Sequence, residues 1–198
     1  MKSEIRKMEN VKDFKKVYKV FSGPPYNEKY TDDELEEIFK EYEEKGFIFG
    51  AYTEEGCVGL LATTVGKKSE HTVDFLNEEV MYLSDIAVLD EYRRTGLGTQ
   101  LMIYGIMAAY SMGYSRMYMR TLEKGKSMSY GIANKLGFSQ IPNAYQIIER
   151  ERTDGSIQGA TNIFLDIDLR NLNKEKLKRE IENSTTIYKK VEESVLEK

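Results

Sequence analysis

Two glycines near the middle of the chain, Gly96 and Gly98, stand where a strand-forming run gives way to a helix-forming run. Residues 80–89 are rich in β-branched and aromatic side chains, and an amphipathic pattern begins at Gly96. The start of a helix offers N–H groups without partners and the positive end of the helix dipole, and glycine lets a bulky anion approach that backbone. These residues therefore predict a cradle for a phosphate group.

The spacing excludes the two best-known phosphate loops. A Walker loop needs a lysine directly after its last glycine, and neither glycine is followed by one. The dinucleotide fingerprint needs a third glycine where this chain has Leu101. The segment Arg93-Arg94-Thr95-Gly96-Leu97-Gly98 instead fits the pattern Gln/Arg-x-x-Gly-x-Gly/Ala. A plain helix start is the alternative, but each glycine in a first helical turn costs about 1 kcal/mol relative to alanine.

This pattern, its place between a strand and an amphipathic helix, and the later segment 133–138 (Ala-Asn-Lys-Leu-Gly-Phe) together resemble the GNAT superfamily of N-acyltransferases. The resemblance covers about residues 1–170. It implies acetyl-CoA or another acyl-CoA as cofactor, with its pyrophosphate on backbone N–H groups between Arg94 and Thr99. It also implies that the strand near Ile86 holds the pantetheine by main-chain pairing and offers an oxyanion donor. The implied cofactor-binding residues are Ile86, Ala87, Val88, Arg93, Arg94, Thr95, Gly96, Leu97, Gly98, Thr99 and Asn134.

The implied reaction is direct attack of an amine on the thioester, so some group must accept a proton from an amine with a pKa near ~10. Family members place basic or water-organising residues at the positions of Tyr82 and Ser84, which makes these two residues catalytic candidates. Neither is a strong base. A water relay toward Glu78 or Glu79 is an alternative.

The alternation of side chains along a strand predicts which of these residues point the same way. Asp85 has a more suitable pKa for a base than tyrosine or serine, but it is expected on the opposite face. The expected faces are Tyr82, Ser84 and Ile86 on one side, and Leu83, Asp85 and Ala87 on the other.

Many GNAT proteins carry a tyrosine four residues before the glycine of the closing motif, where it protonates the departing thiolate. This chain has Ala133 there, and Tyr130 on the same predicted helix is the candidate replacement. A thiol with a pKa near ~8.5 leaves without much help, so activity does not require this acid. The missing tyrosine leaves two hypotheses open. One is an N-acetyltransferase that acts on an amine of a small molecule, protein or peptide, and the other is a CoA-binding sensor or interaction module without catalysis.

The composition narrows the remaining classes. The chain has 198 residues, enough for one domain with an appendage, and no apolar run approaches the ~20 residues of a membrane helix. With no signal-peptide pattern, a cytoplasmic protein is expected. A net charge of −4 gives no basis for nucleic-acid binding. The single cysteine, Cys57, and the single histidine, His71, provide no internal disulfide and too few ligands for a metal site.

The elements that position these residues follow from periodicity, capping residues and turns. Together with the resemblance they predict a mixed α/β fold with a mostly antiparallel sheet of about seven strands, one splayed parallel pair and about four flanking helices. A GNAT domain is expected over 1–170 and a helical extension over 171–198. The expected strands are 2–8, 47–52, 57–65, 80–89, 115–121, 138–150 and 163–169, and the expected helices are 11–21, one beginning after Thr31, 96–112 and 127–136.

The extension has a spacing of its own. Apolar and small residues recur in a 4-3-4-3-4 pattern, which predicts either a short coiled coil, and hence a possible homodimer, or a surface helix lying across its own domain. The residues in this pattern are Leu177, Ile181, Ser184, Tyr188, Val191 and Val195.

Overall fold

The computed structural model describes residues 2–23, 26, 28–65, 80–122, 127–151, 155–183 and 187–188. Its strands are β1 Lys2–Lys7, β2 Gly46–Thr53, β3 Gly56–Val65, β4 Met81–Val88, β5 Arg116–Leu122, β6 Ser139–Glu151, β7 Ile157–Asp168 and β8 Ile187–Tyr188. Its α-helices are α1 Val11–Tyr18, α2 Asp32–Lys45, α3 Leu97–Ser111, α4 Met128–Leu136 and α5 Lys174–Glu182, and short 3-10 turns are η1 Lys19–Ser22, η2 Asp90–Tyr92 and η3 Leu169–Asn171.

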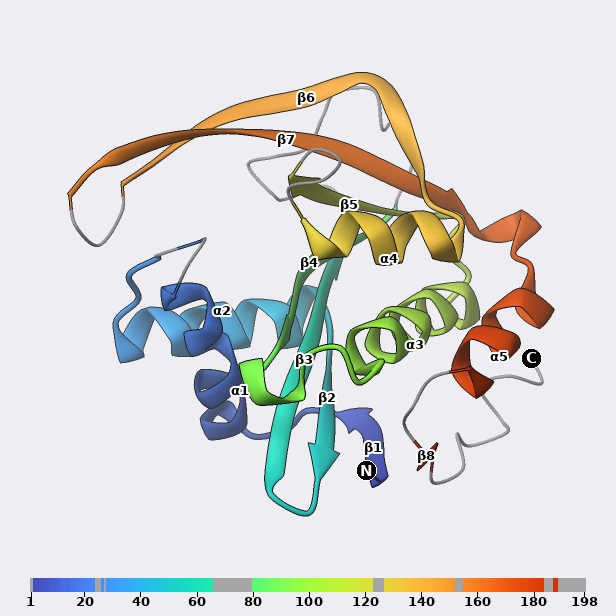
Figure 1. Cartoon of the computed structure of the whole chain (residues 1–198), viewed down its shortest axis with the longest axis horizontal. Helices are drawn as coiled ribbons and strands as arrows, with labels where there is room; N and C mark the ends of the chain where they lie inside the picture. The colour runs from blue at the N-terminus through green and yellow to red at the C-terminus, as the bar shows by residue number, and fades with distance from the viewer. Residues whose placement is uncertain are drawn as a thin grey trace.

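The strands form one sheet in the order β6-β7-β5-β4-β3-β2-β1-β8. Helices α1 and α2 cover one face of this sheet, and α3, α4 and α5 cover the other (Figure 1). The predicted mixed α/β fold is confirmed, with the two-residue strand β8 added at one edge. At the other edge the β6–β7 hairpin arches out beyond the body of the molecule (Figure 1).

The parallel pair of β4 and β5 is short. Met81–Leu83 pair with Met117–Met119, and the pairing stops there although β4 continues to Val88. On its other side β4 stays paired with β3 through Val88. One edge of β4 beyond Leu83 therefore pairs with no strand that the structure describes, which is the splay that the family resemblance implied.

Local signals account for most element boundaries. Thr31 and Glu34 form the capping box expected at the start of α2, and Gly137 ends α4 in a left-handed conformation with φ 108°. The first helix ends at Tyr18 and continues as η1, earlier than predicted. Strand β7 begins at Ile157, six residues before the expected start at Ile163, because its antiparallel partner β6 supplies the pairing that its own sequence pattern does not indicate.

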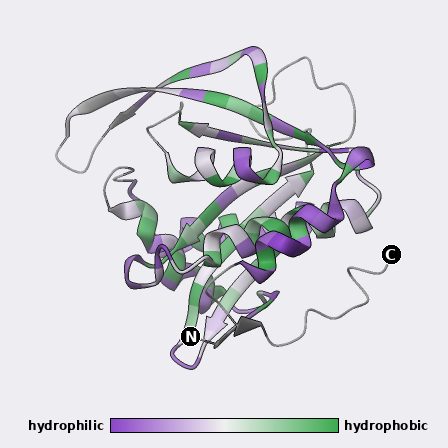
Figure 2. Cartoon of the chain, turned by 45° about the vertical axis from the view of Figure 1, so that its right-hand side comes forward, coloured by the Kyte–Doolittle hydropathy of each residue, from purple (hydrophilic) through white to green (hydrophobic). Residues whose placement is uncertain are grey.

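Helix α3 is apolar on nearly all sides because it lies between the sheet and two other helices. Leu101 and Ile106 are fully buried in a core that also includes side chains from α4 and α5. A second core fills the space between the sheet and the pair α1 and α2. Figure 2 shows the hydrophobic colour concentrated along the strands and the inner faces of the helices. The position of α3 between sheet and helices fixes its N-terminus beside the open edge of β4.

The residues of the 4-3-4-3-4 pattern in the extension do not form one continuous helix, so the predicted coiled coil is wrong. Helix α5 ends at Glu182, and Tyr188 belongs to β8, which pairs in parallel with β1. Leu177 is 1% exposed and Ile181 packs against the same core, so the apolar side of α5 is covered by its own domain. The alternative of a helix lying across its own domain is what the structure has. Ser184, Val191 and Val195 lie outside the described residues.

Removing the Leu177 side chain should therefore destabilise the whole fold. We expect Leu177→Ala to lower the free energy of unfolding by about 2–5 kcal/mol, because a fully buried leucine leaves a cavity when it is shortened. The measurement is the urea midpoint of unfolding, with Lys178→Ala on the exposed side of α5 as the control. An unchanged midpoint for Leu177→Ala would show that α5 contributes nothing to the core.

Candidate active site

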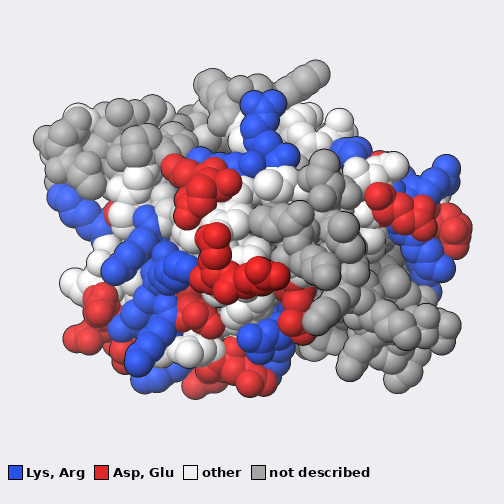
Figure 3. Space-filling view, turned by 60° about the horizontal axis from the view of Figure 1, so that its bottom comes forward, with Lys and Arg blue, Asp and Glu red and all other residues white. Residues whose placement is uncertain are grey.

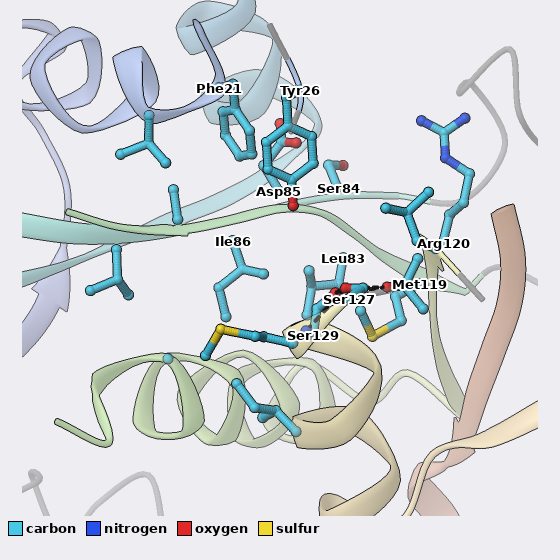
Figure 4. Close-up of a pocket in the computed structure, with 18 of the residues that line it drawn as sticks. Phe21, Tyr26, Leu83, Ser84, Asp85, Ile86, Met119, Arg120, Ser127 and Ser129 are labelled. Atoms are coloured by element: carbon cyan, nitrogen blue, oxygen red, sulfur yellow. Dashed lines mark hydrogen bonds between the residues drawn. The ribbon is translucent and has the colours of Figure 1, made fainter. Parts of the chain in front are cut away.

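A cavity of about 1360 Å³ runs along the open edge of β4 (Figure 4). Its walls come from η1 and the following segment, the glycine turn at the start of α3, the first turn of α4, and the ends of β5 and β7. Strand β4 crosses the cavity, so the glycine turn and the α1–α2 side are two regions of one space. The described lining includes ten members of the predicted site, namely Tyr82, Ser84, Ile86, Ala87, Val88, Arg93, Arg94, Gly96, Gly98 and Thr99.

The glycine turn has the backbone shape of an anion cradle. Gly96 is the N-cap of the 15-residue helix α3 and has φ 92°, a left-handed conformation that glycine adopts without strain. Arg94 is also left-handed, with φ 63°. A Cβ on Gly98 would lie 3.4 Å from Ile132 Cδ1 and 4.0 Å from Val88 Cγ2, so glycine at this position keeps the space between α3, α4 and β4 open. The turn fits the pyrophosphate of a CoA cofactor.

Of the two arginines in the motif, Arg93 is tied to its own loop. Its Nη2 lies 2.8 Å from Asp90 Oδ1, and its Nε donates to the Val88 carbonyl at 3.3 Å. Arg94 lines the cavity from its left-handed position. The side chains of two other motif residues stabilise the fold. Leu97 is buried in the core, and the Thr95 hydroxyl donates to the Tyr92 carbonyl at 2.7 Å.

The main chain of β4 presents hydrogen-bonding groups to the cavity. The Leu89 N–H donates to the Val58 carbonyl of β3 at 2.9 Å. Because neighbouring residues of a strand point their main-chain groups in opposite directions, the N–H groups of Val88 and Ile86 point away from β3. The bond from Arg93 to the Val88 carbonyl agrees with this direction. The edge that β5 leaves open therefore offers main-chain donors beside the glycine turn.

A β-bulge in β4 changes which side chains face each other. Asp85 pairs with Ala62 and Leu83 pairs with the next residue, Thr63, so Ser84 is an extra residue in the ladder. One inserted residue reverses the alternation of side chains beyond it.

The bulge corrects the predicted faces of the strand. Asp85 lies on the side of α1 and α2, whereas Ile86 points toward α3 (Figure 4). Leu83 packs in the core that includes α3, so its neighbour Tyr82 lies on the same side of the strand as Asp85. The expectation that Asp85 lies on the face opposite Tyr82 is wrong, and so is the expectation that Ile86 shares the face of Tyr82. The carboxylate of Asp85, which simple alternation placed on the opposite face, therefore faces the cavity.

The carboxylate of Asp85 is held by two tyrosine hydroxyls. Tyr18 donates to its Oδ2 at 2.9 Å, and Tyr42 donates to the same oxygen. Burial raises the pKa of the Asp85 carboxyl above its ordinary value, and the two tyrosine hydrogen bonds act in the opposite direction. A carboxylate with a raised pKa in a cavity is the kind of group that accepts a proton at neutral pH.

Aromatic rings surround this carboxylate on the α1 side. The Tyr18 ring packs against Phe21 and Tyr30, with centroids 4.8 and 5.4 Å apart, and Phe21 packs against Tyr26 at 5.2 Å. The Tyr30 hydroxyl donates to the Glu28 carboxylate. The result is an aromatic basin, formed by Tyr18, Phe21, Tyr26 and Tyr30, with carboxylates on its wall.

The catalytic candidates named from the sequence have other surroundings. Burial raises the pKa of Tyr82, whose ring packs on Tyr118 at 4.7 Å, so its hydroxyl stays protonated and is no base. The Ser84 hydroxyl lies 3.1 Å from Thr64 Oγ1. Tyr130 packs against the α3 core and Asn134 is exposed, and neither is among the described residues that line the cavity. Glu78, Glu79 and His71 lie outside the described residues.

Sequence reasoning missed a group of hydroxyls where β5 leads into α4. Thr121 Oγ1 lies 2.9 Å from Ser127 Oγ and 2.7 Å from Ser129 Oγ, and all three residues line the cavity. Ser127 also caps α4 by accepting from the Ser129 N–H at 3.1 Å. The N-cap preference of serine could have located Ser127 in advance.

The described residues were also compared with three other kinds of site: a charged binding surface, a metal site and a membrane-spanning helix. On the face drawn in Figure 3, a group of basic side chains at the lower left is bordered by acidic side chains, and further acidic groups lie across the middle of this face. Among the described residues there is no group of three or more potential metal-ligating side chains. No helix in the described ranges is both long and apolar enough to span a membrane.

Comparison with solved structures shows the same fold in other proteins. The N-acetyltransferase of Staphylococcus aureus Mu50 has a TM-score of 0.65 at 16% identity, covering 85% of this chain and 99% of that one. The ribosomal-protein-S18-alanine N-acetyltransferase of Escherichia coli has a TM-score of 0.62 at 15% identity, covering 84% and 94%. A chain of the NatC complex bound to Gag peptide and CoA has a TM-score of 0.61 at 13% identity, covering 85% and 99%.

At the level of sequence, no curated protein matches the chain. The model of the acetyltransferase (GNAT) family matches residues 12–138, a segment that begins in α1 and runs through the glycine turn to the end of the closing motif. Because this match spans more than half of the sequence, the chain belongs to the GNAT family of acetyltransferases.

Proposed function

We propose that this protein transfers an acetyl group from acetyl-CoA to a primary amine, with both substrates bound in the same cavity. The observation that carries the proposal is the continuity of that cavity, which joins the glycine turn at the start of α3 to the Asp85 carboxylate along the open edge of β4. A site for binding CoA alone would not need a held carboxylate on the far side of the strand.

The cofactor side uses main-chain groups. Backbone N–H groups at the start of α3, near Gly96 and Gly98, would bind the pyrophosphate, and Arg94 would add a counter-charge. The N–H groups of Ile86 and Val88 would bind the pantetheine arm and the thioester oxygen. When bound, acetyl-CoA supplies an acetyl thioester that an amine can attack directly, with release of the thiol.

The acceptor side uses the basin around Asp85. An alkyl amine with a pKa near ~10 arrives mostly as an ammonium ion, which a carboxylate attracts. Asp85 would then accept one proton of the ammonium group on a carboxylate oxygen, while Tyr18 and Tyr42 keep the carboxylate in place. The tyrosine rings of the basin exclude water and pack against the carbon chain of the acceptor. Asp85 thus replaces Tyr82, Ser84 and Tyr130 as the proposed proton-transfer residue.

The proposal is tested by calorimetric titration with CoA and acetyl-CoA, followed by an assay of thiol release across a panel of amines. We expect binding in the micromolar range and acceptor-dependent thiol release. Binding without thiol release for any amine would favour a binding module instead of an enzyme. Absence of CoA binding would overturn the proposed function.

A further inference from the structure

The acceptor side of the cavity contains two opposite charges that do not pair with each other. Asp85 and Arg120 both line the cavity, and Figure 4 shows Arg120 rising from β5 on the same side of β4 as Asp85 and Tyr26. Among the described residues, Asp85 has two tyrosine hydroxyls as partners, and Arg120 donates only to Gln146 Oε1, at 2.9 Å. Neither charge is neutralised by an ion pair within the described part of the chain.

The charge of Arg120 also affects the carboxyl group of Asp85. Burial raises the pKa of the Asp85 carboxyl, while the positive charge of Arg120 lowers it. Charged side chains in a partly desolvated wall are normally paired, because an uncompensated charge is costly away from water. An arginine and an aspartate that face one space and are each held by neutral partners leave a gap that a ligand with both charges can bridge.

A buried donor lies on the same wall as Arg120. Asn162 of β7 stands directly opposite Gln146 of β6 and Leu122 of β5, so Arg120, Gln146 and Asn162 lie on three neighbouring strands at the end of the cavity. Asn162 is 4% exposed, and its Nδ2 has no hydrogen-bond partner among the residues that the structure describes. A buried N–H donor without a partner destabilises the empty site, and an oxygen of a ligand seated against this wall would satisfy it.

The wall on the α1 side has the opposite character. Asp85 and Glu28 both line it, and the Glu28 carboxylate accepts the Tyr30 hydroxyl. The acceptor side of the cavity therefore has carboxylates, which attract a cation, on one wall. The opposite wall has hydrogen-bond donors, including the positively charged guanidinium of Arg120. A neutral peptide carbonyl does not need a guanidinium, whereas a carboxylate matches its planar pair of N–H groups.

We propose that the acceptor is a small amino carboxylate, whose ammonium group lies against Asp85 and whose carboxylate is bound by Arg120 with help from Asn162. This inference rests on the proposed acetyl transfer and names its substrate class. Arg120 is then a specificity-determining residue, because it contacts the part of the acceptor that does not react.

The experiment compares thiol release for three versions of each acceptor: the amino acid, its carboxamide and its decarboxylated amine. Leucine, leucinamide and isoamylamine form one such set, and glycine, alanine, phenylalanine and β-alanine provide others. We expect kcat/KM for the best amino acid to exceed that of its matched amine and carboxamide by about 10- to 100-fold, the range for a lost charge-assisted hydrogen bond. Equal values across a set, or a preference for the carboxamide, would overturn the proposal.

Substitution of Arg120 provides a second test of the proposal. Arg120→Gln should raise KM for the preferred amino acid by about 10- to 100-fold more than it raises KM for the matched amine, because only the amino acid loses a contact with the guanidinium. Arg120→Lys keeps the charge and should restore part of the preference. Arg179→Gln, at an exposed arginine of α5, controls for a change of net charge. An equal loss for acid and amine in Arg120→Gln would assign the arginine a structural role.

A binding measurement distinguishes failure of this inference from failure of the proposed acetyl transfer. The panel amino acids are titrated by calorimetry into the protein alone and into the protein saturated with CoA. Binding that weakens in Arg120→Gln supports the inference even where no thiol is released. CoA binding with no binding or turnover of any amino acid overturns the inference and leaves the proposed function intact, whereas loss of CoA binding itself counts against the proposed function.

Discussion

Replacing Asp85 by asparagine should nearly abolish turnover and at the same time stabilise the fold. Asparagine keeps the shape of the side chain and an oxygen that accepts from Tyr18 or Tyr42, but it takes no proton. General-base catalysis typically contributes about 10²- to 10⁴-fold, so we expect kcat to fall by that factor at neutral pH. CoA affinity should not change, because Asp85 faces α1 and α2 and not the glycine turn. The measurement is thiol release with a fixed amine, alongside calorimetric CoA binding.

The stability effect follows from the direction of the Asp85 pKa. Burial raises that pKa in the folded state, so the folded protein holds the proton more tightly than the unfolded chain. The resulting stabilisation is present below the unfolded pKa of about 4 and is lost as the pH rises through the folded value. At pH 7 to 8 the charged carboxylate destabilises the fold, and the neutral amide of Asp85→Asn removes that cost. The urea midpoint of the variant should exceed that of the wild-type protein at neutral pH and converge with it in acid.

The pH profile provides a further check on Asp85. Activity of the variant should recover partly at high pH, where the free amine no longer needs a base. Glu54→Gln, an exposed carboxylate-to-amide change at the β2–β3 turn, should leave turnover and stability unchanged. Turnover of Asp85→Asn within threefold of the wild-type value would remove Asp85 from the mechanism.

A glutamate at Gly98 should block the cofactor cradle. The new side chain would start 3.4 Å from Ile132 Cδ1 and would extend into the space between α3, α4 and β4. Its negative charge would also occupy the helix N-terminus that is expected to bind the pyrophosphate. We expect CoA binding to weaken by at least about 100-fold, which is two steps of about 1.4 kcal/mol each in binding free energy.

The matched control for Gly98→Glu is Gly131→Glu on α4. Gly131 is exposed, a Cβ added there meets nothing within 4 Å, and the residue is absent from the described lining of the cavity. Both variants should remain folded by circular dichroism, since neither glycine needs a left-handed backbone. Equal CoA affinity in Gly98→Glu and the wild-type protein would rule out the glycine turn as the cofactor site.

The sequence by itself determined the glycine turn and most of the elements around it, because these depend on local chemistry. Gly96 and Gly98, the capping box at Thr31 and the glycine after α4 act through the backbone of their own segment. The order of these elements, with a strand-helix-strand crossover, was enough to predict the parallel pair. The α3 N-terminus beside β4 follows from that topology.

Only the tertiary structure brought forward Asp85 as the proposed base. The bulge at Ser84 depends on how β4 pairs with β3, and no local pattern in either strand shows where the extra residue lies. That single residue reverses the direction of Asp85 and brings it to Tyr18 and Tyr42, which are 67 and 43 positions away in the chain. A register shift is a property of two paired strands, so alternation read along one strand could not reveal it.

The positions of Tyr130, Arg120 and helix α5 also depend on contacts between elements that are distant in the sequence. Tyr130 has the sequence position of a catalytic candidate, but its partly buried ring packs against the core that includes α3 and does not line the described cavity. Arg120 and Asn162 share a wall only because β5 and β7 are neighbours in the sheet. The apolar side of α5 has the spacing of a coiled coil. In the folded protein it packs on its own domain, where Leu177 shares a core with α3. Spacing predicts that a helix has an apolar face, whereas the tertiary fold determines what covers it.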